Sequence, residues 1–285
     1  MRLLILFLAI ASTAFAKSLG APGQGGTAPT QNPTFWSFND DQCAKLRNLD
    51  AIAAALRRDR PSSLVFGKCP ALENVDGLRG LDSLWRLKLG DCPALKNVDG
   101  LQGLSSLAEL DLGDTPALQN LDGLKGDTAL VKLYLGRAPA LQNLDALKGL
   151  MRVFELDLPG CPALKNLDVV KGLTALESLG IVGDCPALEN VDALKGLPEL
   201  RLLAFVDCST LQDANGLKGL TNLRMLVFQS CPELRDVSAL KDLPVLERLY
   251  ILACPKIPPE PIAELRAALP KTEITHRRDA PPRSR

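Results

Sequence analysis

The chain has 285 residues, and its 33 lysines and arginines balance its 33 aspartates and glutamates, so the formal net charge is zero. Proteins that bind nucleic acids need a basic surface to neutralise phosphates, so we expect no nucleic-acid partner. Hydrophobic residues make up 46% of the chain and aromatic residues only 4%, and with the abundance of leucine and glycine this bias indicates a repeated sequence.

The first 16 residues have the pattern of a secretory signal peptide. Met1-Arg2 is a basic start, residues 3–11 are an apolar run, and Ala14-Phe15-Ala16 is a small-residue cleavage site. We expect cleavage after Ala16 and a secreted, periplasmic or extracellular protein. No later stretch is long and apolar enough to span a bilayer. Residues 17–38 are rich in Gly, Pro, Gln and Thr, which predicts a flexible leader.

Residues 39–61 are expected to form an N-terminal cap helix. Asn39-Asp40-Asp41-Gln42 resembles a capping box, and apolar residues then recur at helical spacing up to Arg60-Pro61. This helix would shield the first strand, residues 64–66, from water, as the terminal units of repeat proteins must.

Residues 62–253 are predicted to be repeats. The segment CPALENVDGLRGLDSLWRLKLGD at residues 69–91 recurs in units that begin at Cys92, Thr115, Ala138, Cys161, Cys185, Cys208 and Cys231. There are eight full units of 23 residues, except that the Cys161 unit has 24. A shortened unit at residues 254–275 is expected to be a C-terminal cap, and residues 276–285 a disordered tail.

Within each unit the frame Leu84-x-x-Leu87-x-Leu89-x-x-Cys92-x-x-Leu95 resembles the leucine-rich-repeat consensus, with Cys in place of the usual Asn. The resemblance covers residues 62–275, and the other half of each unit is similar to internalin-like and phosphatase-regulator-like repeats. It implies an α/β solenoid: a curved, concave parallel β-sheet with short helical or 3-10 turns on the convex side.

Two columns of the repeat suggest how those turns are built. Side chains that cap helix N-termini occupy one column, which predicts one short helical turn per unit: Asp76, Asp99, Asp122, Asp145, Asp168, Asp192, Asn215 and Ser238. A left-handed exit would favour the glycines four residues later, at 80, 103, 126, 149, 172, 196 and 219. Calcium binding by the aspartates is disfavoured, because capping also explains Asn215 and Ser238.

Seven of the eight cysteines fill one repeat position, at 69, 92, 161, 185, 208, 231 and 254. Thr115 and Ala138 replace them in two units, which indicates a packing slot. A linear column with one histidine in the whole chain does not converge on zinc, so we expect no metal and no cofactor. We expect mostly free, buried thiols; whether Cys43 pairs with Cys69 stays open.

The sequence offers no catalytic residues that can be defended. Its one histidine, His276, lies beyond the last repeat, so a Ser-His-Asp or Cys-His arrangement inside the repeats is not expected. A phosphate-binding G-x-x-x-x-G-K-[ST] loop is also missing from the sequence. We therefore predict that the protein is not an enzyme.

Outward residues on the strands divide into two halves. In the first half they are charged pairs of alternating sign, which predicts a cross-strand ladder in water: Arg86/Lys88, Glu109/Asp111, Lys132/Tyr134 and Glu155/Asp157. In the second half the charge nearly vanishes: Ser178/Gly180, Leu202/Ala204, Met225/Val227 and Arg248/Tyr250, with Val206 and Leu252 one step on.

An apolar surface at positions that the repeat leaves to solvent is typical of an interface. The hypothesis is that a protein partner binds Leu202, Ala204, Val206, Met225, Val227, Tyr250 and Leu252. Coverage of this surface by one of the chain's own tails or by the opposite rim is the alternative. Trp85 and Phe154 are a second, weaker candidate site.

The sequence thus predicts a secreted leucine-rich-repeat protein that mediates protein–protein interaction through its concave face and is not catalytic; its partner is not identified. The alternative is an extracellular adhesive protein that binds carbohydrate or matrix. Sugar sites usually need exposed aromatic residues, and Tyr134 and Tyr250 are the only outward tyrosines, so carbohydrate is the second choice.

Overall fold

A computed structural model describes residues 34–127, 129–160, 164–183, 185, 188 and 191–278, apart from the side chain of Pro159. The predicted signal peptide, most of the predicted leader, Cys161 and the end of the predicted tail lie outside the described residues. The repeats belong to one compact unit that begins at Thr34.

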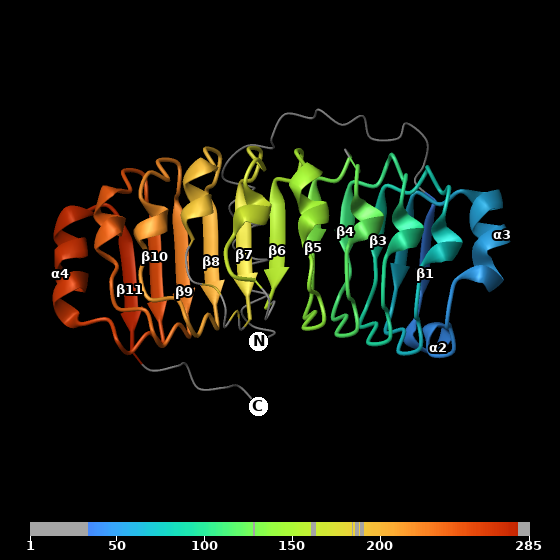
Figure 1. The fold of residues 1–285 in the computed structure, drawn as a ribbon, viewed down its shortest axis with the longest axis horizontal. Coiled ribbons are helices and arrows are strands. Elements are labelled where there is room, and N and C mark those ends of the chain that lie inside the picture. Colours follow the sequence, from blue (N-terminus) through green and yellow to red (C-terminus); the bar gives the residue numbers. More distant parts are fainter. Residues whose placement is uncertain are drawn as a thin grey trace. The chain divides into compact units, whose positions relative to one another are not determined.

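The repeats build one open, parallel sheet of eleven strands whose spatial order is the order of the chain (Figure 1). Leu87, Leu110 and Leu133 stand in register, as the repeat predicts. The strands are β1 (Phe35–Phe38), β2 (Ser63–Phe66), β3 (Arg86–Lys88), β4 (Glu109–Asp111), β5 (Lys132–Tyr134), β6 (Glu155–Pro159), β7 (Ser178–Val182), β8 (Leu202–Val206), β9 (Met225–Gln229), β10 (Arg248–Leu252) and β11 (Glu273–Arg277).

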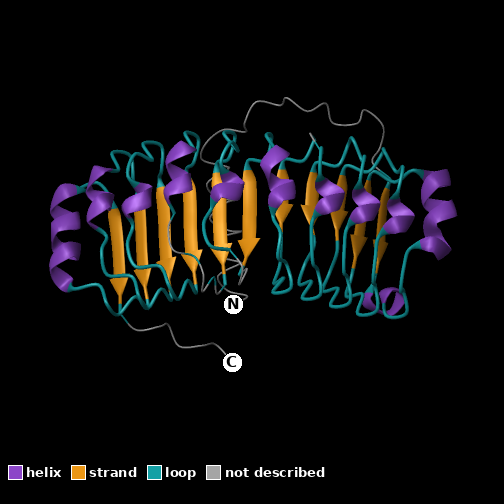
Figure 2. Ribbon diagram, viewed as in Figure 1, coloured by secondary structure: helices purple, strands orange, loops and turns teal. Residues whose placement is uncertain are grey.

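A second layer of short 3-10 helices lies along one face of the sheet, with longer helices at the two ends (Figure 2). This confirms the predicted turns. The 3-10 helices are η1 (Asp76–Leu78), η2 (Asp99–Leu101), η3 (Asp122–Leu124), η4 (Asp145–Gly149), η5 (Asp168–Val170), η6 (Asp192–Gly196), η7 (Asn215–Leu217) and η8 (Ser238–Asp242). The end helices are α2 (Asp40–Cys43) and α3 (Asp50–Asp59) before the repeats and α4 (Pro259–Ala268) after them.

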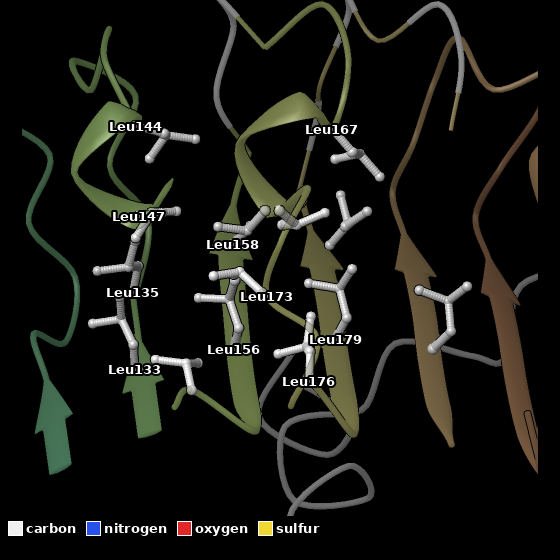
Figure 3. Close-up of a cluster of buried hydrophobic side chains, with 14 of the residues drawn as sticks. Leu133, Leu135, Leu144, Leu147, Leu156, Leu158, Leu167, Leu173, Leu176 and Leu179 are labelled. Atoms are coloured by element: carbon white, nitrogen blue, oxygen red, sulfur yellow. The ribbon is translucent and has the colours of Figure 1, made fainter. Parts of the chain in front are cut away.

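The core fills the space between the two layers with columns of leucine. In one unit Leu84, Leu87, Leu89, Cys92 and Leu95 are all 0% exposed, and the same positions are buried in the neighbouring units. Figure 3 shows this packing at β5 to β7, where side chains such as Leu133, Leu156 and Leu179 stand side by side. One unit cannot bury its leucines alone, so each turn is sealed by the turns beside it.

The turn before seven of the 3-10 helices, all except η6, differs from the prediction, because the residue of the aspartate column does not cap. The residue two positions upstream accepts the backbone N–H instead: Asn97 Oδ1 accepts from Asp99 N at 3.2 Å, and Asn143 Oδ1 from Asp145 N at 2.6 Å. The aspartate side chain is then left to pair with the cation three residues later, as Asp145 does with Lys148 at 2.6 Å. An Asx turn therefore starts the helix, and an ion pair lies on its surface.

The glycine prediction is confirmed in five units and wrong in two. Gly103, for example, has φ +80°, and Gly80, Gly126, Gly172 and Gly219 are also left-handed. Gly149 and Gly196 instead end the longer helices η4 and η6. In η4 and η6 the residue after the aspartate is alanine, whereas it is glycine before Gly80, Gly103, Gly126 and Gly219.

Both ends of the sheet differ from the predicted boundaries. Phe35–Phe38 of the expected leader forms β1, which pairs with β2. The expected single cap helix is two helices: the predicted capping box of Asn39 and Gln42 starts α2, and Asn48 Oδ1 accepts from Asp50 N at the start of α3. At the other end, β11 extends through His276 to Arg277, inside the expected tail.

The cysteine column lies in the core. The seven cysteines within the described ranges are all buried, and both Cys43 and Cys69 are free thiols. Their thiols hydrogen-bond to the chain, as Cys254 Sγ does to the Leu252 carbonyl at 3.4 Å. Hydrogen bonding with Cys208 is the main cause that raises the pKa of Cys231 to about 12, and burial adds to it. Cys231 is therefore a packing residue in the thiol form, which reacts slowly.

Candidate functional site

The candidate site lies on the face of the sheet opposite the leucine core, which we call the outer face. Because side chains alternate along a strand, every second residue points away from the core, and the parallel register lines these residues up in rows. The first row includes Arg86, Leu202 and Met225, and the second includes Lys88, Ala204 and Tyr250. A third row exists only where the strands are longer, through Val182, Val206, Gln229 and Leu252.

Six charged residues of the outer face on β3 to β6 pair across neighbouring strands as predicted, and Asp157 of the predicted ladder is not among them. Arg86 Nε lies 3.3 Å from Glu109 Oε2, Lys88 Nζ 2.7 Å from Asp111 Oδ2, and Lys132 Nζ 3.2 Å from Glu155 Oε2. These charges neutralise one another and leave little net potential for an ionic ligand.

The seven predicted binding residues come together on three adjacent strands, and we call them the apolar patch. Leu202 and Met225 are partners in the first row, Ala204, Val227 and Tyr250 in the second, and Val206 and Leu252 lie in the third. Their side chains are on the face that the repeat leaves to solvent, and Leu202, Met225 and Val227 are nonetheless only 5, 3 and 8% exposed.

The apolar patch is a hydrophobic layer separate from the core. Leu203 and Phe205 of β8 point inward and belong to the continuous core cluster, while Leu202, Ala204 and Val206, which alternate with them, do not. Beneath the patch, Phe205 and Phe228 stack with ring centroids 5.4 Å apart and an interplanar angle of 7°. The strands that carry the patch are therefore supported by the largest side chains of the inner layer.

Two polar residues of the outer face were missed by sequence reasoning. Asp157 was assigned to the charged ladder, but within the described ranges its carboxylate makes no ion pair or hydrogen bond, although its backbone carbonyl accepts from Leu135 N. Gln229 lies in the third row between Val206 and Leu252, and its Oε1 is buried without a hydrogen-bond partner. The signal for Gln229 was present in the sequence, since it occupies the same repeat position as Val206 and Leu252.

The carboxylate of Asp157 leans toward the apolar patch. A Cβ added to Gly180, its neighbour on β7, would collide with Asp157 Oδ1 and lie 3.3 Å from Asp157 Cγ. Burial, followed by the nearby charges of Glu155 and Asp111, raises the pKa of Asp157 to about 7. Burial, followed by Glu155, also raises the pKa of Tyr134, which faces the other side of Asp157.

His276 is part of the sheet, whereas the sequence predicted that a disordered tail begins at this residue. It lies in β11 in register with Ile251, and its Nε2 is buried without a hydrogen-bond partner. Burial, followed by Arg278 and Arg266, lowers the pKa of His276, which favours the neutral ring. Over the described residues, no group of three or more His, Cys, Asp or Glu could hold a metal ion.

The second candidate site is smaller. Trp85 is 39% exposed, and Phe154 lies under Lys132, whose Nζ is 5.4 Å from the ring centroid. These residues precede β3 and β6 and are not brought together by the fold, since two strands separate them. They form no surface comparable with the apolar patch.

Comparison with solved structures decides the fold. Internalin C2 from Listeria monocytogenes is 22% identical with a TM-score of 0.52, over 71% of this chain and 84% of that one. The leucine-rich-repeat domain of the type III effector XopL is 19% identical with a TM-score of 0.57, over 93% and 80% of the two chains. The chain has the leucine-rich-repeat fold. The sequence matches no protein-family model and no curated protein.

The leucine-rich-repeat fold is also shared with TLR13 in its complex with ssRNA13, at 18% identity and a TM-score of 0.58. The match covers 87% of this chain and only 40% of TLR13. At such identities the likeness concerns the fold, and the ligand of each protein depends on its own outer face. Within the described part of this leucine-rich-repeat chain, no helix is long and apolar enough to cross a membrane.

Proposed function

We propose that this protein is a secreted, non-catalytic binding protein that holds a protein partner on its apolar patch. The observation that carries the proposal is a layer of apolar side chains, in register on β8, β9 and β10, that lies on the outer face and outside the core cluster. Contiguous apolar residues at outward positions of a sheet are typical of an interface, and in this patch Tyr250 and Leu252 are half-buried while the other five residues are at most 8% exposed.

Secretion is proposed from the first 16 residues, which lie outside the described part of the chain and have the charge, apolar run and cleavage site of a signal peptide. Export through this route would present the sheet to extracellular or periplasmic proteins. The mass of the exported protein, which should lack residues 1–16, checks this part of the proposal.

A nucleic acid such as the RNA of the TLR13 complex is a weaker candidate. A phosphate backbone needs several unpaired cations, and three cations of the outer face, Arg86, Lys88 and Lys132, are each paired with a carboxylate. Carbohydrate is also weaker, because Tyr250 is the only aromatic residue of the apolar patch.

The test places a photo-crosslinking phenylalanine derivative at position 225, in the patch, and separately at position 151. Met151 is the matched control, because it is the same residue type, 52% exposed, and in a turn before β6. After incubation with an extracellular protein extract, position 225 should crosslink to a second protein that position 151 does not capture. Met225→Asp should abolish binding of that protein, and Met151→Asp should not.

Crosslinks from position 225 to the chain's own residues 17–33 or 279–285 would contradict the proposal, because they would show that the patch is covered by this chain. Binding of the captured protein by Met225→Asp with unchanged affinity would contradict it as well. Far-ultraviolet circular dichroism of both aspartate variants controls for loss of the fold.

A further inference from the structure

Two hydrogen-bond acceptors on the outer face have no donor in the described part of the chain. The carboxylates of Glu109, Asp111 and Glu155 are each held by a lysine or arginine, and Asp157 is not. Gln229 Oε1 is buried and has no hydrogen-bond partner. A buried polar atom without a partner, such as Gln229 Oε1, is rare in folded proteins, because it loses its hydrogen bonds to water, whereas Asp157 is half-buried. A ligand with two donors would satisfy both atoms.

The charges around Asp157 indicate that the hydrogen-bond donor missing from its carboxylate is a cation. Glu155 on its own strand and Asp111 on β4 are acidic and disfavour a negative charge on Asp157, and Tyr134 on β5 lies beside it in register. The cations of this half, Lys88 and Lys132, are already bound to Asp111 and Glu155. Strand β7 adds no titratable group, because it places Ser178 and Gly180 in these rows. Among the described residues, no cation pairs with Asp157.

The direction of Asp157 connects this site to the apolar patch. Its carboxylate occupies the space over Gly180, on the side of β8 and Ala204. Gly180 and Ala204 are the two smallest residues of their row, so no bulky side chain of that row separates the carboxylate from the patch. An extended segment lying across β7 to β10 would pass both.

We propose that the partner presents a linear segment in which apolar residues cover the patch, one lysine or arginine pairs with Asp157, and one N–H group donates to Gln229 Oε1. This inference rests on the proposed function and adds the chemistry of the ligand. Strands β6 and β9 are three strand spacings apart, about 14 Å, and Gln229 lies one row further along, about 7 Å, so the straight path is about 16 Å, or roughly five residues of extended chain. The basic residue and the donor are therefore about five residues apart.

The protonation of Asp157 makes this recognition dependent on pH. With a pKa of about 7 in the free protein, Asp157 is largely protonated at pH 6 and ionised at pH 8. Only the ionised form pairs with a cation, so affinity for a basic segment rises as the pH passes from 6 to 8. A lysine or arginine ligand stays charged throughout this range.

The experiment selects a displayed library of random linear peptides on the full mature chain at pH 8. Enriched peptides should combine apolar residues with one lysine or arginine. A synthetic peptide of the enriched sequence should bind Asp157→Asn about tenfold or more weakly than the wild type and should not bind Met225→Asp. Asp168→Asn is the matched control, because Asp168 is a paired carboxylate on the helical layer, and should leave binding unchanged.

Calorimetry of the same peptide at pH 6 and pH 8 should show tighter binding at pH 8 for the wild type and no such change for Asp157→Asn. Apolar peptides that depend on Met225 but carry no enriched basic residue would overturn this inference and leave the proposed function standing. Basic peptides that bind Asp157→Asn as tightly as the wild type would do the same. Failure of Met225→Asp to affect any selected peptide would overturn the proposed function itself.

Discussion

Strands β3 to β5 and strands β8 to β10 carry the same inward leucine pattern but use their outward positions differently. The first group has charged rows paired across strands, and the second has the apolar patch. The first group's strands are three residues long and the second group's five. Position by position, Gly90, Gly113 and Gly136 stand where the later repeats have Val206, Gln229 and Leu252.

That glycine column explains the difference in strand length. A Cβ at Gly90 would collide with the Gly67 carbonyl, and one at Gly136 with the Gly113 carbonyl, because the backbones of neighbouring turns lie close together here. The strands of the first group end before this position. Where a side chain replaces the glycine, the strand continues and a third outward row appears. One repeat position therefore decides how wide the outer face is, and the wide half is the apolar one.

The largest expected effect is a loss of stability when a core side chain beneath the apolar patch is removed. Phe228→Ala removes one of two stacked, fully buried rings under the patch, and the cavity should lower the free energy of unfolding by about 3–5 kcal/mol. Urea denaturation measures this change. Phe35→Ala is the matched control, because Phe35 is 60% exposed, and should change stability by less than about 0.5 kcal/mol. A loss below about 1 kcal/mol at Phe228 would mean that the stacked pair does not support the sheet.

The next effect is the pH dependence of stability caused by Asp157, which lies on β6 between the charged strands and the apolar patch. The pKa of Asp157 is about 7 in the folded chain and ordinary when unfolded, so the folded state holds a proton that the unfolded state releases between these values. Stability contributed by this group therefore falls as the pH rises from about 4 to 7. Asp157→Asn should be more stable than the wild type by about 1 kcal/mol or more at pH 8, and this difference should be clearly smaller at pH 5.

Urea denaturation at the two pH values checks that prediction for Asp157. Asp111→Asn is the control on the same row, because it breaks the 2.7 Å pair with Lys88 and should not stabilise the protein at pH 8. Equal stability differences for Asp157→Asn at pH 5 and pH 8 would show that the carboxylate is ionised normally.

The smallest effect is expected in the charged half. A double-mutant cycle on Lys88→Ala and Asp111→Ala should give a coupling energy of about 0.2–1 kcal/mol, because the two side chains are 46 and 28% exposed and water screens their attraction. The coupling should decrease in 1 M salt, at about a 3 Å Debye length. A cycle on Lys88 and Asp157, which make no ion pair, is the control and should give a value near zero. A salt-independent coupling would contradict the surface-pair description.

The repeat unit by itself determined most of the fold. Near-identical segments of 23 residues stack at a constant spacing, so Leu87, Leu110 and Leu133 had to fall in register and the outward residues had to form rows. The apolar patch and the paired charges of β3 to β6 could be read in this way, because a row in space is a column in the aligned repeats.

Tertiary structure alone decided the features that break the repeat. β1 and His276 join the sheet at its two ends, where no neighbouring unit exists to reveal a strand by alignment. The direction of Asp157 over Gly180 and the missing partner of Gln229 depend on which side chains stand beside them in space. Hydrogen bonds and charges act over a few ångströms in three dimensions, whereas a sequence pattern specifies only where each side chain starts.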